Sequence, residues 1–200
     1  MFLSSHEAIS IFQSSIRSWH INLKPAENPY GENSIKYLLF KKNQVDTIQW
    51  HLEDEIRRLD LHPAEFIAIK REIDKRNQER TDLVEEIDDR FIANFADLPL
   101  LLYARLQSES PAWMLDRMSI LELKIHHMSE QTVRTDVPSS HIELTSAKLE
   151  VLAEQRTDLS LCFDSFLEER NLGTAYFKLY RQMKMYNDEK LNPSLYKASI

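Results

Sequence analysis

Glycine is almost absent from this chain, since only Gly31 and Gly173 occur among its 200 residues. Tight β-turns and phosphate-binding loops depend on glycine, because few other residues tolerate a positive φ angle. Neither the GxGxxG motif nor the P-loop motif can be written with two glycines. The scarcity therefore favours helices and excludes the glycine-rich nucleotide sites.

Cysteine is equally scarce, since Cys162 is the only one. A single cysteine excludes an internal disulfide and any zinc site built from several thiolates. It agrees with a reducing compartment, and we expect the protein to be cytoplasmic. Cys162 stands between Leu161 and Phe163 in a segment of helical spacing, so we interpret it as a buried structural thiol.

Long apolar runs and a basic excess are also lacking. No run approaches the roughly 18 apolar residues of a transmembrane helix, and the first dozen residues do not resemble a signal peptide. The net charge of −7 disfavours nucleic acid and anionic lipid as bulk partners. With 42% hydrophobic residues, the chain predicts one soluble domain over residues 1–200.

Apolar residues recur at helical spacing along nearly the whole chain, which predicts an all-α fold. Capping boxes of the Ser-x-x-Glu type begin at Ser4 and at Ser140. Pro63 and Pro111 suit the first turn of a helix, and Gly173 suits a helix end. Helices are expected over residues 5–20, 43–61, 63–95, 111–129, 140–172 and 174–188.

A short sequence echo suggests an internal repeat. The tetrapeptide Arg-Thr-Asp-Leu at residues 80–83 recurs at residues 156–159, a shift of 156 − 80 = 76 positions. We interpret the echo as one helical hairpin used twice, over residues 43–95 and 111–172. Two antiparallel hairpins predict a four-helix bundle, with the first and last helices packed on its outside.

The same echo places arginines on apolar faces. At about 100° per residue, Arg80 and Arg156 fall in the middle of their helices' apolar stripes. Glu122 also points inward, on a helix that is apolar around most of its circumference. Buried charges are costly alone, so we predict that Glu122 meets Arg156, Arg80 or both. Asp82 and Asp158 are interpreted as surface acids. The inward charges could fix the helix register or line a polar ligand cavity.

A second polar group surrounds Trp50, which points away from the apolar stripe of its helix. Asp46, Glu53, Asp54 and Arg57 share that side. A tryptophan beside carboxylates and an arginine could stack a base or a sugar ring. The alternative is that Trp50 packs under a terminal helix.

Metal-binding signatures are not evident. His126 and His127 are adjacent and face different ways on a helix, His51 is distant in sequence, and no HExxH motif occurs. We therefore expect no metal site, and we interpret the acidic residues Asp82, Glu85, Glu86 and Asp89 as a solvated face.

Aromatic and basic residues alternate over residues 176–190. This segment could hold a sugar phosphate, or it could be an amphipathic helix docked on the acidic bundle. We prefer docking.

Three stretches resemble a known bacterial family. They are LFKKNQVDTIQWHLED at residues 39–54, DRMSILELKI at 116–125, and KMYND at 184–188 followed by LNP at 191–193. Together with residues 73–82, they are similar to the domain-of-unknown-function family numbered 4254. The residues that these motifs single out are Trp50, His51, Glu53, Asp54, Asp74, Asn77, Arg80, Asp116, Arg117, Glu122 and Lys124.

The resemblance implies a context rather than a reaction, because no activity or catalytic residue belongs to the family's description. Its members are often encoded among glycosyltransferases for surface polysaccharide. We therefore expect an accessory or ligand-binding factor in lipopolysaccharide or capsule synthesis. A glycosyltransferase or a sugar nucleotide would be its partner, no cofactor is identified, and a homo-oligomer stays open.

The alternative is a metal-dependent nucleotide pyrophosphohydrolase, since all-helical enzymes of that kind also place carboxylates on two helices. Glu53 and Asp54 opposite Asp74 or Asp88 would then hold Mg²⁺. The expected ExxE motif is absent, because Ile56 stands three residues after Glu53. Whether the protein is an enzyme is left open by the sequence.

Overall fold

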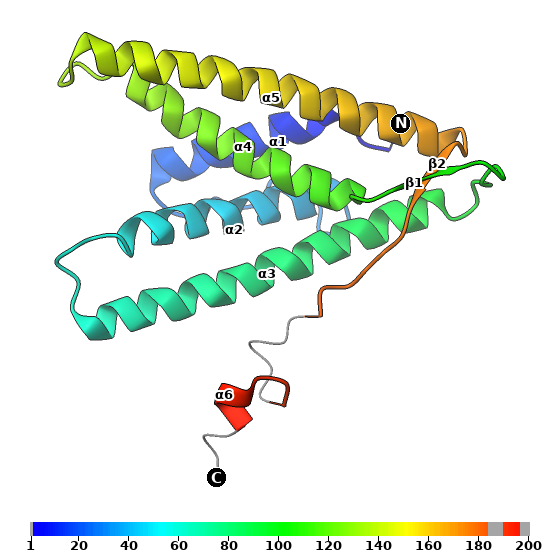
Figure 1. The fold of residues 1–200 in the computed structure, drawn as a ribbon, viewed down its shortest axis with the longest axis horizontal. Helices are drawn as coiled ribbons and strands as arrows, with labels where there is room; N and C mark the ends of the chain where they lie inside the picture. Colours follow the sequence, from blue (N-terminus) through cyan, green and yellow to red (C-terminus); the bar gives the residue numbers. More distant parts are fainter. Residues whose placement is uncertain (1, 184–189, 197–200) are drawn as a thin grey trace.

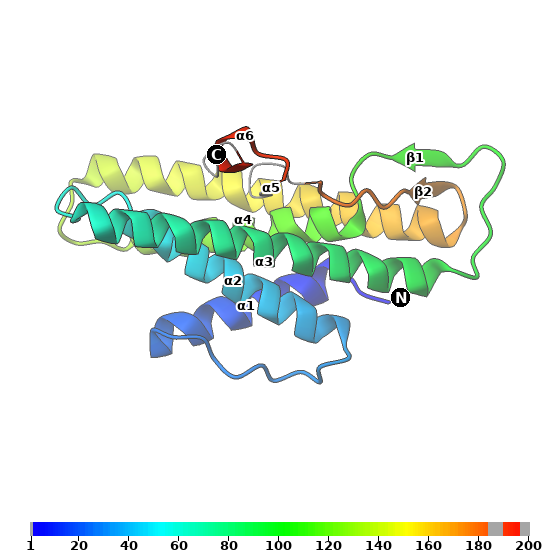
Figure 2. The same ribbon diagram turned by 90° about the horizontal axis from the view of Figure 1, so that it is seen from below.

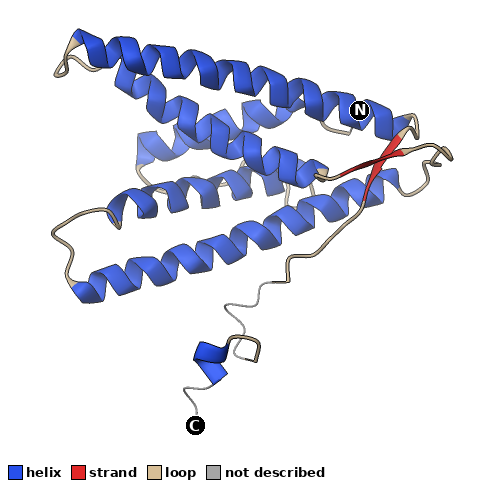
Figure 3. Cartoon of the chain, in the orientation of Figure 1, coloured by secondary structure: helices blue, strands red, loops and turns tan. Residues whose placement is uncertain are grey.

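The computed structural model describes residues 2–183 and 190–196, and this part of the chain is all-α apart from two short strands (Figure 3). The sequence prediction of an all-α fold is confirmed. The helices are α1 (Ser5–Asn22), α2 (Ile35–Glu55), α3 (Pro63–Phe95), α4 (Pro111–Thr132), α5 (Ser139–Asn171) and the single turn α6 (Pro193–Tyr196). The strands are β1 (Arg105–Gln107) and β2 (Ala175–Phe177).

Two helical hairpins dominate the architecture. Helices α2 and α3 run antiparallel as one pair, and α4 and α5 form the other (Figure 1). Helix α4 joins the pairs, because it also packs against α2 and α3. No described helix is both long and apolar enough to cross a membrane.

Helix α1 belongs to the core. It lies on the side of the molecule opposite the C-terminal segment (Figure 2) and packs against α2, α4 and α5. Its residues Ala8, Ile11 and Phe12 join the central apolar cluster, where they meet Phe91 and Phe163 of the two hairpins. The N-terminal helix is therefore part of the central packing and not an addition outside it, and the predicted four-helix bundle is not confirmed.

Local capping chemistry explains most helix starts. The capping box of Ser4 and Glu7 forms, and Ser110 caps α4 as its position before Pro111 predicts. The second predicted box was wrong. Helix α5 begins at Ser139, one residue before Ser140, and its N-cap makes no side-chain hydrogen bond.

The second helix is displaced from its predicted bounds of 43–61. It begins at Ile35, where the Ser34 hydroxyl accepts a hydrogen bond from the Tyr37 amide, and it ends at Glu55. Pro63 disfavours the helical conformation only at His62, so it does not account for the earlier end at Glu55. The early start means that the predicted repeat unit of 43–95 omits the first two turns of α2. The repeat itself stays a prediction.

The helix predicted over 174–188 does not form in its described part, and residues 184–188 lie outside the described residues. Gly173 ends α5 with φ of 73°, and a Cβ atom there would lie 2.5 Å from the Pro99 carbonyl oxygen. The chain then leaves in an extended conformation, and β2 pairs in parallel with β1, Ala175 lying opposite Arg105.

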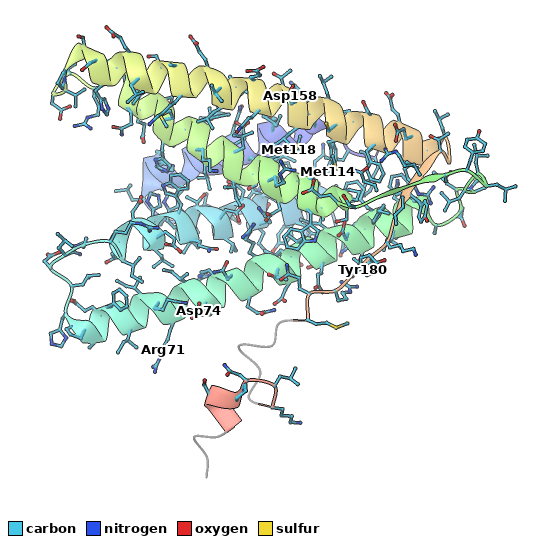
Figure 4. All side chains as sticks on the ribbon, in the orientation of Figure 1. Arg71, Asp74, Met114, Met118, Asp158 and Tyr180 are labelled. Carbon is cyan, nitrogen blue, oxygen red and sulfur yellow. The ribbon has the colours of Figure 1, made fainter. Side chains whose placement is uncertain are left out.

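The described part of the segment after β2 contacts α3, although not as the amphipathic helix that was expected. Arg181 binds Glu85 at 3.2 Å and Asp89 at 2.7 Å, while Tyr180 lies on the same stretch (Figure 4). The acidic residues of α3 therefore partner this segment. Cys162 was wrongly predicted to be buried, because its side of α5 is exposed.

Candidate functional site

A network of four charged residues lies where α2, α3 and α4 meet. Lys42, which is 1% exposed, contacts the carboxylates of Asp46 and Asp116, the latter at 2.8 Å. Arg80 binds Asp116 through two hydrogen bonds, one of them from Nε to Oδ1 at 2.7 Å. Two cations and two carboxylates balance, which makes their burial tolerable.

The pKa values of Asp46 and Asp116 shift in opposite directions. Burial raises the pKa of Asp46, and Asp116 adds to the rise while Lys42 opposes it. Burial also acts on Asp116, but Lys42 and Arg80 outweigh it and hold the Asp116 pKa below its usual value. Ser119 donates to Asp46 Oδ2, whereas Asp46 Oδ1 has no hydrogen-bond partner among the described residues. That oxygen is buried and lies 3.7 Å from Arg80 Nε.

Glu122 forms a separate buried group. Its carboxylate accepts a hydrogen bond from Gln13 at 2.9 Å and lies 3.8 Å from Arg156. Burial raises the Glu122 pKa, and Gln13 and Arg156 reduce that rise. The predicted contact with Arg156 is confirmed. Arg80 binds Asp116 instead, so the two echoed arginines pair with different carboxylates of α4.

A cavity of about 300 Å³ opens beside the charge network, between α2, α3 and α4. We call it the first cavity. His127 stacks on Trp50 with ring centroids 4.9 Å apart, so the ligand-accessible face of the indole is the other one. The side of α2 predicted to surround Trp50 does gather here. The lining residues are Asp46, Gln49, Trp50, Glu53, Asp54, Arg57, Arg80, Ile120 and Leu123.

A second cavity of about 450 Å³ lies between α3, α4 and α5, and it shares Arg80 and Ile120 with the first. Its lining residues are Arg80, Asp116, Arg117, Ile120, Leu121, Lys124, Gln155, Asp158 and Leu159. Asp158 of α5 (Figure 4) is exposed, as predicted for a surface acid, and it also lines this cavity. Arg80, whose side chain is 25% exposed, therefore stands between the two cavities.

Several predicted residues lie elsewhere. Neither cavity is lined by His51, Asn77, Glu122 or Arg156. Asn77 supports the wall indirectly, because it accepts a hydrogen bond from Gln49 at 2.9 Å. Asp74 pairs with Lys70 on α3, near Arg71 (Figure 4), and also lines neither cavity.

Other residues of the site were not predicted from the sequence. Lys42 was not predicted because the expected helix began at residue 43. Gln49 and Ile120 carry no charge that would mark them, and Gln155 was assigned no role. The usable signal for Lys42 was a lysine in an apolar stretch, Leu38 to Phe40, that belongs to the helix.

The carboxylates expected to hold Mg²⁺ do not assemble. Glu53 and Asp54 line the first cavity, but Asp74 and Asp88 do not. In the described part of the chain, the one group of metal-binding side chains with converging ligand atoms consists of His20, His126 and His127. His126 and His127 were expected to face different ways on their helix, yet both rings contact His20.

Asp88 is engaged at the start of α4, where it accepts hydrogen bonds from the Ser110 hydroxyl and the Ala112 amide. Burial raises the Asp88 pKa to about 6, against the two hydrogen bonds, which lower it. The carboxyl group is therefore structural, and it makes the stability depend on pH.

We expect the stability contribution of Asp88 to fall as the pH rises from about 4 to about 6. The folded pKa is the higher one, so in this window the folded protein binds more protons than the unfolded chain, and deprotonation favours unfolding. A rise of roughly two pKa units corresponds to about 3 kcal/mol. Urea unfolding of the wild type and of Asp88→Asn at pH 4 and pH 7 measures this contribution to the free energy of unfolding. A stability difference between the two proteins that does not change with pH would contradict the assignment.

Comparisons with known proteins agree with the sequence resemblance. A family model described as "Protein of unknown function (DUF4254)" matches residues 36–179, which include all of α3, α4 and α5. No curated protein and no solved structure matches the chain.

Proposed function

The chain belongs to the DUF4254 family, and we propose that it is a binding protein for a nucleotide sugar, held across the two adjoining cavities. The observation that carries the proposal is the junction at Arg80. At Arg80 the first cavity, which has an aromatic ring and carboxylates, adjoins the second cavity, which has further cations. The volumes lie at the lower end of the range for small-molecule sites.

The first cavity suits the sugar or the base. Trp50 offers an aromatic face for stacking, which is favourable for flat or apolar ring surfaces. Glu53 and Asp54, which line this cavity, offer carboxylate acceptors for hydroxyl groups. Such acceptors recognise neutral polar groups and would repel a phosphate.

The second cavity suits the diphosphate. Arg80, Arg117 and Lys124 supply cations against the carboxylates of Asp116 and Asp158. Asp116 is already neutralised by Lys42 and Arg80, and Arg117 pairs with Glu109 at 3.0 Å, so Lys124 is the main cation that a phosphate meets. Arginine and lysine are common phosphate-binding residues.

We further propose an accessory role in cell-surface polysaccharide synthesis in the cytoplasm, with a glycosyltransferase as the partner. Two points support this role. Members of the family that the chain resembles are often encoded among glycosyltransferases, and the side chains of the two cavities suit a nucleotide sugar. The metal-dependent pyrophosphohydrolase has less support, because Asp74 and Asp88 stand apart from Glu53 and Asp54.

Calorimetric titration with UDP-glucose, UDP and glucose tests the proposal. We expect Trp50→Leu to weaken UDP-glucose binding about 10-fold or more, since aromatic stacking contributes roughly 1–3 kcal/mol per ring. Lys124→Ala should weaken binding of UDP-glucose and UDP and leave that of glucose unchanged. Arg134→Ala, which removes an exposed arginine paired with Asp136, is the matched control.

Two results would contradict the proposal. One is equal affinity of the wild type, Trp50→Leu and Lys124→Ala for UDP-glucose. The other is Mg²⁺-dependent phosphate release from UDP-glucose that Glu53→Gln abolishes, because such turnover would favour the hydrolase.

A further inference from the structure

Four histidines from three helices gather at one end of α4. His20 of α1 lies against His126 and His127 of α4, with ring centroids 4.3 Å and 5.0 Å away. One ring nitrogen from each of these three lies within 4.8 Å of the others. His51 of α2 is next, 5.3 Å from His20 by ring centroid. All four side chains are partly buried.

The ring nitrogens that converge here lack partners. The Nε2 atoms of His20, His51, His126 and His127 are buried, and none has a hydrogen-bond partner among the described residues. A buried polar atom without a partner costs roughly 1–3 kcal/mol. Four such atoms from four neighbouring rings point to a ligand that accepts nitrogen lone pairs.

Hydrogen bonds on the opposite ring nitrogen fix the tautomer of two of these histidines. His20 Nδ1 lies 2.8 Å from the Ile16 carbonyl oxygen, and His127 Nδ1 lies 3.0 Å from a carboxylate oxygen of Glu130. Both oxygens can only accept, so both Nδ1 atoms carry a proton, and in the neutral rings both Nε2 atoms keep a lone pair. Metal-binding histidines are typically held by a carbonyl or carboxylate in this way.

Burial favours the neutral form of two of the four rings, His51 and His126. Burial lowers the pKa of His51, and His20 and His127 lower it further. Burial likewise lowers the pKa of His126, followed by the influence of His20. Neutral imidazole is the form that binds a metal ion. The Glu130 carboxylate, 3.7 Å from His126, offsets part of a bound cation's charge.

We propose that His20, His126 and His127 bind a divalent transition-metal ion, Zn²⁺, with the fourth coordination position left for water or another ligand. Imidazole donors select zinc and its first-row neighbours, whereas Mg²⁺ and Ca²⁺ require oxygen donors. Zinc–nitrogen bonds of about 2.0–2.1 Å place tetrahedral ligand nitrogens roughly 3.4 Å apart. The ring nitrogens lie within 4.8 Å of one another, so bringing them to this spacing requires ring movements of about 1 Å. This site does not depend on the nucleotide-sugar proposal.

The site also lies behind a wall of the first cavity. His127 stacks on Trp50, which lines that cavity, and Trp19 stacks on His51 at 6.0 Å. The two indoles supply apolar surroundings, which strengthen the binding of a cation by neutral donors because water is kept away.

Metal titration of the full chain, purified without a histidine tag and stripped with a chelator, tests the proposal. We expect one Zn²⁺ per chain, and we expect Co²⁺ to give the intense visible absorption of a four-coordinate ion. His126→Gln and His127→Gln should each weaken Zn²⁺ binding at least about 100-fold, and Glu130→Gln about 10- to 100-fold. His6→Gln, on an exposed part of α1, should leave the affinity unchanged.

Circular dichroism of the metal-free variants shows whether they fold. Equal Zn²⁺ affinity in the wild type, His126→Gln and His127→Gln would overturn the proposal. So would a weakly absorbing, six-coordinate Co²⁺ spectrum of the wild type, a result that needs no variant to be folded.

Discussion

Replacing Asp116 with asparagine is expected to lower the free energy of unfolding by about 3–5 kcal/mol, because breaking a buried charge network leaves uncompensated charge. Asp116 is the carboxylate that Lys42 and Arg80 share. Asparagine keeps the shape and removes the negative charge, so two cations would face Asp46 alone. Lys42, at 1% exposure, could not be hydrated without opening the junction of α2 and α4.

Urea unfolding followed by circular dichroism measures this loss. Asp74→Asn is the matched control, because it removes one carboxylate of an exposed pair with Lys70, whose contribution should stay below about 1 kcal/mol. Adding Lys42→Met to Asp116→Asn restores the charge balance between Asp46 and Arg80. The double variant should therefore recover about 1 kcal/mol or more relative to Asp116→Asn. If Asp116→Asn and Asp74→Asn cost the same, the network does not carry the stability assigned to it.

Truncating Phe12 to alanine is expected to cost about 3–5 kcal/mol, the usual loss for a fully buried phenylalanine. Phe12 is 0% exposed and belongs to the same apolar cluster as Phe91 and Phe163. This large effect follows from the place of α1 in the core. An N-terminal helix packed loosely on the outside would give a much smaller loss.

The control for Phe12 is on the same helix. Ile21 is 79% exposed, so Ile21→Ala should change the free energy of unfolding by no more than about 0.5 kcal/mol. Thermal and urea unfolding of both variants give the comparison. Similar small losses in both would contradict the assignment of α1 to the core.

Arg80 connects stability with the proposed function. It binds Asp116 in the charge network, and its partly exposed side chain lies between the two cavities. A ligand phosphate near Arg80 would meet a guanidinium already held in place by two hydrogen bonds, which reduces the entropy lost on binding. The same residue can therefore fix the helix register and orient a ligand.

Much of the secondary structure was predictable because it depends on local chemistry. The apolar spacing predicted α1, α3, α4 and α5 close to their observed bounds, and Ser4 and Ser110 cap helices as predicted. The wrong predictions also have identifiable causes, one in a helix cap and one in strand pairing. Ser140 lies inside the first turn of α5, and the segment after Gly173 pairs with β1 rather than coiling.

The inward charges were predictable in kind but not in pairing. Helical periodicity placed Arg80, Arg156 and Glu122 on buried faces, and the cost of burying a lone charge required partners for them. Which carboxylate each arginine meets depends on the offset between α3, α4 and α5, and no single helix carries that information. Arg80 meets Asp116, while Arg156 meets Glu122.

The sequence by itself determined that the chain is helical and that the side of α2 around Trp50 is polar, because composition and periodicity are properties of contiguous residues. Its motifs resemble those of the DUF4254 family, and the family-model match agrees. Only the tertiary structure decided that two cavities meet at Arg80 and that His20 joins His126 and His127. His20 and His126 are 126 − 20 = 106 positions apart in sequence. They become neighbours because α1 packs against α4, a contact that arises from the burial of apolar faces and that sequence spacing cannot reveal.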